Sequence, residues 1–224
     1  ALCMAISGKC YLSLDNTGRS ANRGECMQLC RRAYEVTDIE TGTGLVVDNK
    51  YIMSPKDLCT IEFMDKIIDA GVKVFKIEGR ARSAEYVKRC ARCYRKAADA
   101  VAEGTYAKEL AADLKKELAE VFNRGFWDGY YQGARLGEWS SVYGSESTRK
   151  KVYCGKITNW FNKIGVAEVL VESGELNLGD DIIILGKTTG VLEMKVDDMR
   201  VDMNPATICP KGVFCSISVP LEDL

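Results

Sequence analysis

The fold is decided by one stretch of the chain, Gly71-Val72-Lys73-Val74-Phe75-Lys76-Ile77. Its apolar residues predict a short buried strand over 72–77. A helix is predicted before it, with Ser54 as N-cap and Pro55 at the first helical position, ending at Gly71. Two further helices are predicted after the strand, one capped by Ser83 and running to about 103, and one near 108–123. Helix, buried strand, loop and helix in this order predict parallel α/β construction.

Toward the N-terminus the pattern predicts shorter elements. Alternating small and apolar residues predict a strand from Leu2 to about Leu14. A hairpin is predicted from 34–36 and 51–53, which flank the glycine-containing turn Thr41-Gly42-Thr43-Gly44.

Toward the C-terminus the periodicity changes. Residues 126–150 are rich in Gly, Ser and aromatic residues, and this segment either stacks bases or sugars or, as we favour, packs along a domain junction. Five β-rich runs follow: 152–157, 165–171, 181–185, 191–201 and 213–219. They predict a small antiparallel β-barrel, which serves either as an RNA contact or as an accessory domain.

The predicted fold class is therefore α/β plus all-β. We assign residues 1–125 to part of a (β/α) barrel, 126–150 to a junction and 151–224 to the small β-barrel.

Composition excludes several classes of function. Lys plus Arg total 31 against 32 Asp plus Glu, so nucleic-acid binding by bulk charge is excluded. The chain contains no histidine, which removes the commonest general base and every Ser-His or Cys-His nucleophile pair. No apolar run approaches the roughly 18 residues that cross a bilayer. With no signal-peptide pattern at the start, we expect a cytoplasmic protein without membrane contact.

The 10 cysteines are the strongest chemical signal. Cys3, Cys10, Cys26 and Cys30 form a Cys-x6-Cys-x15-Cys-x3-Cys series that passes through a polar, glycine-bearing loop. Four such thiolates fit tetrahedral zinc or a four-cysteine iron–sulfur cluster, and the alternative is reduced cysteines near a core.

Cys90 and Cys93 have the spacing of a redox pair. They lie within the predicted helix 84–103 at core-facing positions, and no strand directly precedes them. We interpret them as core residues.

Charged residues follow the predicted strand 72–77. Lys76, Glu78 and Arg80 alternate, so they share one side of the strand end, where ligands gather in parallel α/β folds. Glu78 and Arg80 form either a clamp for an anionic substrate, with Gly79 allowing close approach, or a salt bridge that closes the turn into the next helix.

Two blocks of this sequence resemble a known family. Residues 1–13, followed by Asn22-Arg23-Gly24-Glu25-Cys26 and Cys30-Arg31, closely resemble the signature of the collagenase-like peptidase family number thirty-two. Lys76-Ile77-Glu78-Gly79-Arg80, with Tyr86 and Tyr94-Arg95, is similar to its next block.

The resemblance implies a function. Family members are described as peptidases, while others act in oxygen-independent hydroxylation of tRNA wobble uridine, of ribosomal RNA cytidine or of ubiquinone precursors. They resemble one another in carrying a 4Fe-4S cluster, and the tRNA branch is linked to prephenate. By this resemblance Cys3, Cys10, Cys26 and Cys30 are the cluster ligands, with Cys59 as an alternative, and Lys76, Glu78 and Arg80 are the catalytic candidates.

Three functions are carried forward from this resemblance. They are an iron–sulfur-dependent RNA hydroxylation protein with prephenate as co-substrate, a peptidase, and a non-enzymatic binding module that holds zinc. The resemblance also implies an N-terminal barrel half before this signature, so we expect this piece alone to be inactive and to associate with that half or with itself.

Overall fold

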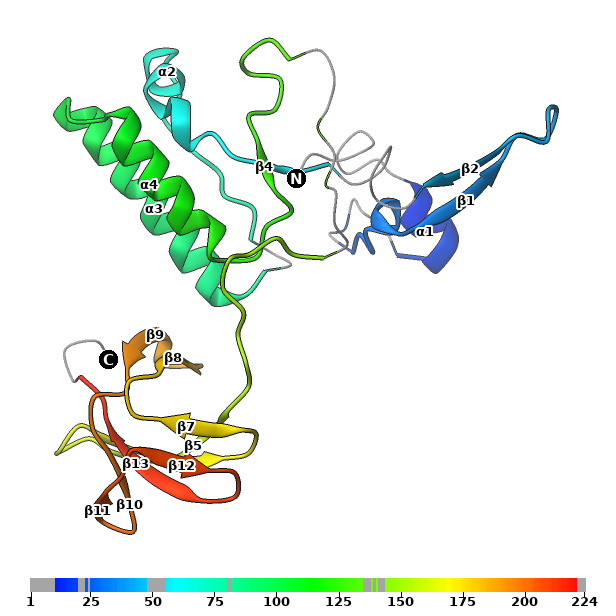
Figure 1. Ribbon diagram of the computed structural model, residues 1–224. Coiled ribbons are helices and arrows are strands. Elements are labelled where there is room, and N and C mark those ends of the chain that lie inside the picture. Colours follow the sequence, from blue (N-terminus) through cyan, green and yellow to red (C-terminus); the bar gives the residue numbers. More distant parts are fainter. Residues whose placement is uncertain are drawn as a thin grey trace. The chain divides into compact units, whose positions relative to one another are not determined.

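The computed structural model describes residues 11–19, 23, 25–47, 55–79, 82–134, 138, 140 and 144–220. The chain divides into two compact units, Ala1–Arg149 and Lys150–Leu224 (Figure 1). Each unit has its own hydrophobic core, as expected for independently packed domains.

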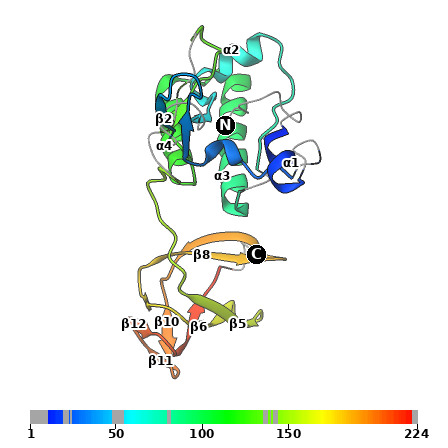
Figure 2. The ribbon, with the colours of Figure 1, turned by 90° about the vertical axis from the view of Figure 1, so that its right-hand side faces the viewer.

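Two antiparallel helices dominate the first unit. α3 spans Ala84–Glu103 and α4 spans Lys108–Ala119, and they lie side by side in both ribbon views (Figures 1 and 2). Ser83 caps α3, since its Oγ accepts a hydrogen bond from the Tyr86 N–H at 3.3 Å. α3 ends at Gly104 in the left-handed conformation. The predicted bounds of α3 are therefore confirmed, whereas α4 ends four residues before the predicted 123.

The remaining elements of this unit are short. The helices are α1 (Tyr11–Thr17), α2 (Met64–Asp69) and the 3-10 turns η2 (Leu29–Arg31) and η3 (Ile61–Phe63). The strands are β1 (Tyr34–Thr37), β2 (Gly44–Val47), β3 (Asp57–Leu58) and β4 (Phe126–Trp127). β1 and β2 form an antiparallel hairpin, and β3 pairs with β4 in parallel.

Three N-terminal predictions are wrong in part. The predicted strand 2–14 includes the start of helix α1, and its first nine residues lie outside the described ones. β1 pairs with 44–47 because the turn Asp38–Thr43 closes the hairpin locally, and 51–53 lie outside the described residues. The helix predicted from Pro55 begins only at Met64, because Asp57 and Leu58 bond to β4 first.

The buried strand predicted over 72–77 does not form. Among the described residues this segment has no strand partner, and Val74 is 84% exposed. β-propensity needs a neighbouring ladder and a covering face, so an apolar run without both stays irregular. Gly71 does end the preceding helix, with φ of 92°.

The second unit contains only strands among its described residues. They are β5 (Gly155–Phe161), β6 (Val166–Val171), β7 (Glu175–Asn177), β8 (Asp181–Gly186), β9 (Gly190–Lys195), β10 (Met199–Val201), β11 (Asn204–Pro205), β12 (Ile208–Pro210) and β13 (Phe214–Ser218). The main sheet has the order β11-β10-β13-β6-β5, and β7/β12 and β8/β9 form antiparallel pairs. All five β-rich runs thus contain strands, and the described residues show no closed barrel.

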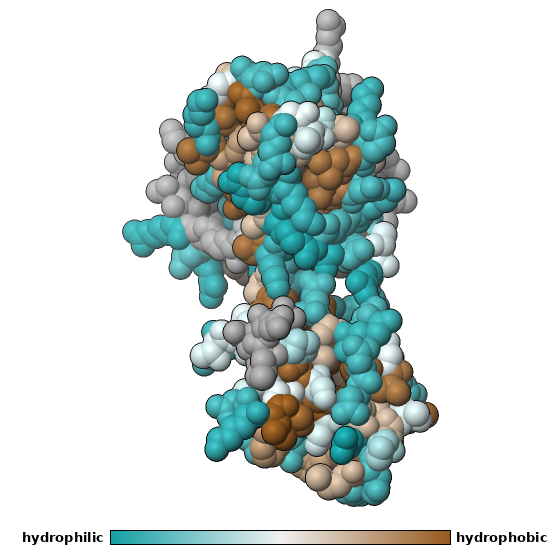
Figure 3. Space-filling model, turned by 90° about the vertical axis from the view of Figure 1, so that its left-hand side faces the viewer, coloured by the Kyte–Doolittle hydropathy of each residue, from teal (hydrophilic) through white to brown (hydrophobic). Residues whose placement is uncertain are grey.

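Figure 3 shows one face of the molecule, where hydrophilic side chains surround separate hydrophobic patches on both units. The fold is a mixed helix-and-sheet structure with several antiparallel sheets, which confirms the predicted class at this coarse level.

Candidate functional site: the cysteine loop and the strand pair β3–β4

The cysteine loop of residues 25–31 presents two of the predicted ligands. Cys26 is exposed, and its Sγ accepts a hydrogen bond from the Gln28 N–H at 3.4 Å. Gln28 has φ of 52°, and this left-handed turn directs its N–H to the sulfur. Cys30 lies half-buried in η2. Cys3 and Cys10 lie outside the described residues.

Two hydrogen bonds fix this loop. The Met27 N–H donates to Oγ of the buried Ser13 on α1 at 2.9 Å. The Tyr34 hydroxyl donates to the Leu29 carbonyl at 2.6 Å. The loop is therefore tied to α1 on one side and to β1 on the other.

The donor chemistry of the loop fits a thiolate-bound metal. The exposed Cys26 sulfur is accessible to a metal, and N–H···S bonds of the kind that Gln28 donates tune cluster-bound thiolates. Within the described part of the chain, no three ligand-type side chains converge on one point.

Cys59 directly follows β3, and its environment is the opposite of that of Cys26. It is buried against α3, and burial raises the pKa of its thiol. The Tyr94 hydroxyl accepts a hydrogen bond from the Thr60 N–H at 2.9 Å and another from the Thr60 hydroxyl at 3.3 Å. The Tyr94 hydroxyl itself donates to Cys59 Sγ at 3.8 Å. Cys59 is thus held as a neutral thiol in the helix core.

Cys90 and Cys93 belong to the same core. Burial raises the pKa of Cys90 to about 11 and that of Cys93 to about 12. Because both thiols stay protonated at neutral pH, neither is an activated nucleophile. The interpretation of this pair as core residues is confirmed.

A buried ion-pair cluster lies at the start of β3. Asp57 Oδ2 lies 3.5 Å from Arg82 Nη2 and accepts the Arg124 N–H at 3.1 Å. The Arg82 guanidinium lies over the Phe122 ring, 4.0 Å from its centroid. This cluster fixes the turn into α3.

Sequence reasoning missed this cluster because it assigned Asp57 to a helix N-terminus. Its partners lie 25 and 67 positions away, so only the tertiary fold reveals them.

The predicted catalytic residues lie in the irregular segment after 71. Lys76 and Glu78 are exposed, and Arg80 lies outside the described residues. Gly79 packs against α3, because a Cβ there would meet Val87 Cγ2 at 2.6 Å. The close approach at Gly79 is therefore to this helix.

An aromatic turn, residues 128–133, directly follows Trp127, the last residue of β4. Trp127 is buried, whereas Tyr130 and Tyr131 are 55% and 67% exposed. The Trp127 and Tyr130 rings meet edge to face at 5.3 Å, and Tyr131 lies 6.0 Å from Phe63. The packing of this segment along a domain junction, favoured from the sequence, stays a prediction.

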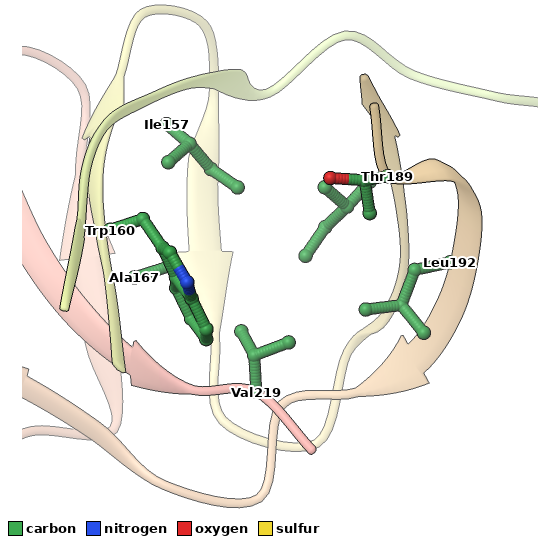
Figure 4. A pocket seen from close by; sticks show the side chains of 7 residues that line it. Ile157, Trp160, Ala167, Thr189, Leu192 and Val219 are labelled. Carbon is green, nitrogen blue, oxygen red and sulfur yellow. The ribbon is translucent and has the colours of Figure 1, made fainter. Parts of the chain in front are cut away.

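The second unit contains a pocket of about 110 Å³. Trp160 on β5 and Leu192 on β9 line it, and Thr189 supplies a hydroxyl (Figure 4). None of its lining residues carries a titratable group, and Thr189 supplies its one hydroxyl.

No helix among the described residues has the length and apolar character needed to cross a membrane.

The chain is similar to curated proteins with two kinds of name. It is 54% identical over its whole length to "Collagenase" of Porphyromonas gingivalis, of which it covers 53%. It is 41% identical over 62% of its length to the 23S rRNA 5-hydroxycytidine synthase of Escherichia coli, of which it covers 22%. It is 29% identical over 99% of its length to tRNA hydroxylation protein P of Haemophilus influenzae, of which it covers 58%.

The chain therefore spans about half the length of the collagenase-named relative. No solved structure matches it. The model of peptidase family U32 matches residues 1–141, the part that contains the cysteine loop, both helices and the strand pair. The chain belongs to peptidase family U32.

Proposed function

We propose that the full-length protein is an iron–sulfur-dependent RNA hydroxylation protein that acts on a tRNA wobble uridine, with prephenate as co-substrate. The observation that carries the proposal is the cysteine loop, in which the exposed Cys26 sulfur already has a backbone N–H donor. Relatives named for tRNA and rRNA hydroxylation support RNA as the substrate class.

In this proposal Cys3, Cys10, Cys26 and Cys30 hold the cluster, which supplies one-electron chemistry when bound. Gln28 donates to the Cys26 sulfur, and Ser13 holds the loop against α1. Cys59 is the alternative ligand from the sequence, although its thiol faces the helix core.

Lys76, Glu78 and Arg80 remain the predicted contacts for an anionic substrate such as prephenate. Lys76 and Glu78 are exposed, so both are accessible to a ligand.

A peptidase is the second candidate, because the collagenase-named relative is 54% identical. The chain lacks histidine, and Cys59, Cys90 and Cys93 are buried thiols with raised pKa. Without histidine, no Ser-His or Cys-His pair can activate a nucleophile, and these three thiols stay protonated at neutral pH. A peptidase mechanism in this chain would therefore have to work without a Ser-His or Cys-His pair and without these three thiols.

One experiment separates the two candidates. The full-length gene is deleted in its host, and the strain is complemented with wild-type protein or with Cys26→Ala. We expect mass spectrometry of total tRNA nucleosides to lose a hydroxylated uridine in the deletion strain, to regain it with wild type and to lack it with Cys26→Ala.

Unchanged tRNA nucleosides in the deletion strain would contradict the proposal. Cleavage of gelatin by the repurified wild-type protein, retained in Cys26→Ala, would favour the peptidase.

A further inference from the structure

The hairpin β1–β2 has an apolar face that is exposed. Val36 and Leu45 lie directly opposite each other on the two strands, and each is 46% exposed. Antiparallel sheets commonly bury one face and leave the other to solvent. Neither core cluster of the described residues includes a hairpin residue, and in Figure 1 the hairpin extends away from α3 and α4. Within the described part of the chain, this face therefore lacks a cover.

The tip of the hairpin holds a further apolar side chain on a fixed turn. Ile39 is 98% exposed. Asp38 Oδ1 accepts hydrogen bonds from the Glu40 N–H at 2.9 Å and from the Thr41 N–H at 2.8 Å. The Asp38 carbonyl accepts the Gly42 N–H at 2.8 Å. These bonds define the turn, so Ile39 is held outward by a well-fixed backbone.

The hairpin is also acidic. Residues 34–47 include Glu35, Asp38 and Glu40 and contain no lysine or arginine. All three acidic residues are exposed. Hydrogen bonds from Thr41 and Glu40 lower the pKa of Asp38, so its carboxyl is charged at neutral pH. We call residues 34–47 the acidic hairpin. Such a surface repels phosphates and attracts a surface with apolar and basic side chains.

The exposed face of α3 has the complementary character. Its exposed side chains recur at helical spacing, so they lie along one side of the helix. Both small apolar and basic residues contribute to it. We call this surface the basic stripe, and it is made up of Val87, Lys88, Ala91, Arg92, Arg95 and Lys96.

Acidic side chains neutralise only part of the charge of the basic stripe. Arg92 pairs with Glu117 on α4, and Arg95 pairs with Asp99 on α3. Over its whole length α3 has five cations and three carboxylates, and α4 has three of each. The helix pair is therefore positive, and its excess charge belongs to α3.

We propose that the acidic hairpin of one copy of the protein packs on the basic stripe of a second copy. Both surfaces are present in every molecule, and neither hairpin strand packs against α3 of its own chain. Two copies related by a two-fold axis would form this contact twice. The inference concerns assembly and goes beyond the proposed function, since it holds for an RNA or a peptide substrate alike.

A second copy explains both surfaces, whereas RNA fits only one. The basic stripe would attract phosphates, but the acidic hairpin would repel them. An RNA strand on the stripe would also leave Ile39, Val36 and Leu45 exposed. A second copy covers these side chains and pairs the charges of both surfaces in the same contact.

Sedimentation velocity of anaerobically purified full-length protein tests the contact. We expect a reversible dimer that weakens in about 0.5 M sodium chloride, because salt screens exposed charges. Glu35→Lys with Glu40→Lys reverses the hairpin, and Lys88→Glu with Lys96→Glu reverses the stripe. Each double variant alone should raise the dimer dissociation constant about 10-fold or more, since like charges then meet.

A mixture of the two double variants is the sharpest test. In the mixed dimer the reversed hairpin meets the reversed stripe, and the native hairpin of the other copy meets a native stripe. Both contacts join opposite charges, so the mixture should dimerise although each variant alone is mainly monomeric. All four substituted positions are exposed, so both variants should match wild type in circular dichroism.

Ile39→Ser tests the apolar part of the contact. It should weaken the dimer about 10-fold, because the side chain is buried only on association. Ile164→Ser is the matched control, since Ile164 is 69% exposed in a turn of the second unit. Equal weakening by the two variants would remove the hairpin tip from the interface.

Three outcomes would overturn the proposal. They are a wild-type protein that stays monomeric at about 100 μM, dimers unchanged by either charge reversal, and a mixture of reversed variants that stays monomeric. If reversal of the stripe abolished binding of oligouridine RNA and left the dimer unchanged, the stripe would instead be an RNA contact.

Discussion

The cysteine loop and the helix core hold the same residue type in opposite surroundings. In the loop, Cys26 is exposed and accepts an N–H bond. In the core, Cys90 and Cys93 are buried on α3, with pKa values raised by burial to about 11 and about 12. The loop leaves the Cys26 sulfur accessible to a metal, whereas burial in the core favours the neutral thiols of Cys90 and Cys93. Spacing alone would make Cys90 and Cys93 a redox pair, and their burial with raised pKa values does not support that role.

The largest effect that tests this contrast is loss of metal. Cys26→Ala should lose nearly all iron and sulfide from anaerobically purified full-length protein, because a four-thiolate cluster needs every ligand. Cys90→Ala should keep full iron, since its thiol lies in the helix core. Iron assays on both variants check this. A full iron content in Cys26→Ala would show that Cys26 is not a cluster ligand.

The second largest effect is on the free energy of unfolding and tests the packing of the helix core. Cys93 is fully buried beside Glu117, and Cys93→Ser would place a smaller and more polar group in this tightly packed position. We expect the free energy of unfolding to fall by about 2 kcal/mol, with iron content unchanged. Urea unfolding checks this, with the exposed Ser173→Ala as control. Equal unfolding midpoints for Cys93→Ser and the control would show that Cys93 is not packed.

The pH dependence of stability follows from the raised pKa values of the core thiols. The folded state retains the protons of Cys90 and Cys93 at a pH where the unfolded chain, with thiol pKa near 9.0, has released them. The stabilisation is fully present below pH 9 and is lost as pH rises toward about 11 and 12. The slope is about 1.4 kcal/mol per pH unit for each proton.

Urea unfolding of wild type and Cys93→Ala between pH 8.5 and 10.5 would measure this slope. Wild type should lose stability more steeply, and parallel curves would contradict the assignment of a retained proton to Cys93.

The smallest effect concerns the support of the loop. Ser13→Ala removes the acceptor of the Met27 N–H, which should cost about 1 kcal/mol. The cluster should still form but release iron faster to a chelator. Thr17→Ala is the control on the same helix, because the Thr17 hydroxyl bonds only within α1. Identical iron-release rates would show that Ser13 does not hold the loop.

The sequence predicted those elements whose signals are local. Ser83 and the apolar spacing of 84–103 located α3, and alternation located the strands of the second unit. The segment 72–77 failed, because a strand needs a partner that its own residues do not encode.

For the candidate site, the polar surroundings of Cys26 and the helical spacing of Cys90 and Cys93 were readable from the sequence. The Asp57–Arg82 pair and the Tyr94–Cys59 contact were not, since they join residues 25 and 35 positions apart.

The measurement that tests the central claim most directly is the iron, acid-labile sulfide and zinc content of anaerobically purified full-length protein. We predict about four iron and four sulfide per chain, with thiolate-to-iron absorption in the visible spectrum. One zinc per chain without iron would contradict the account and make the cysteine loop a structural zinc site.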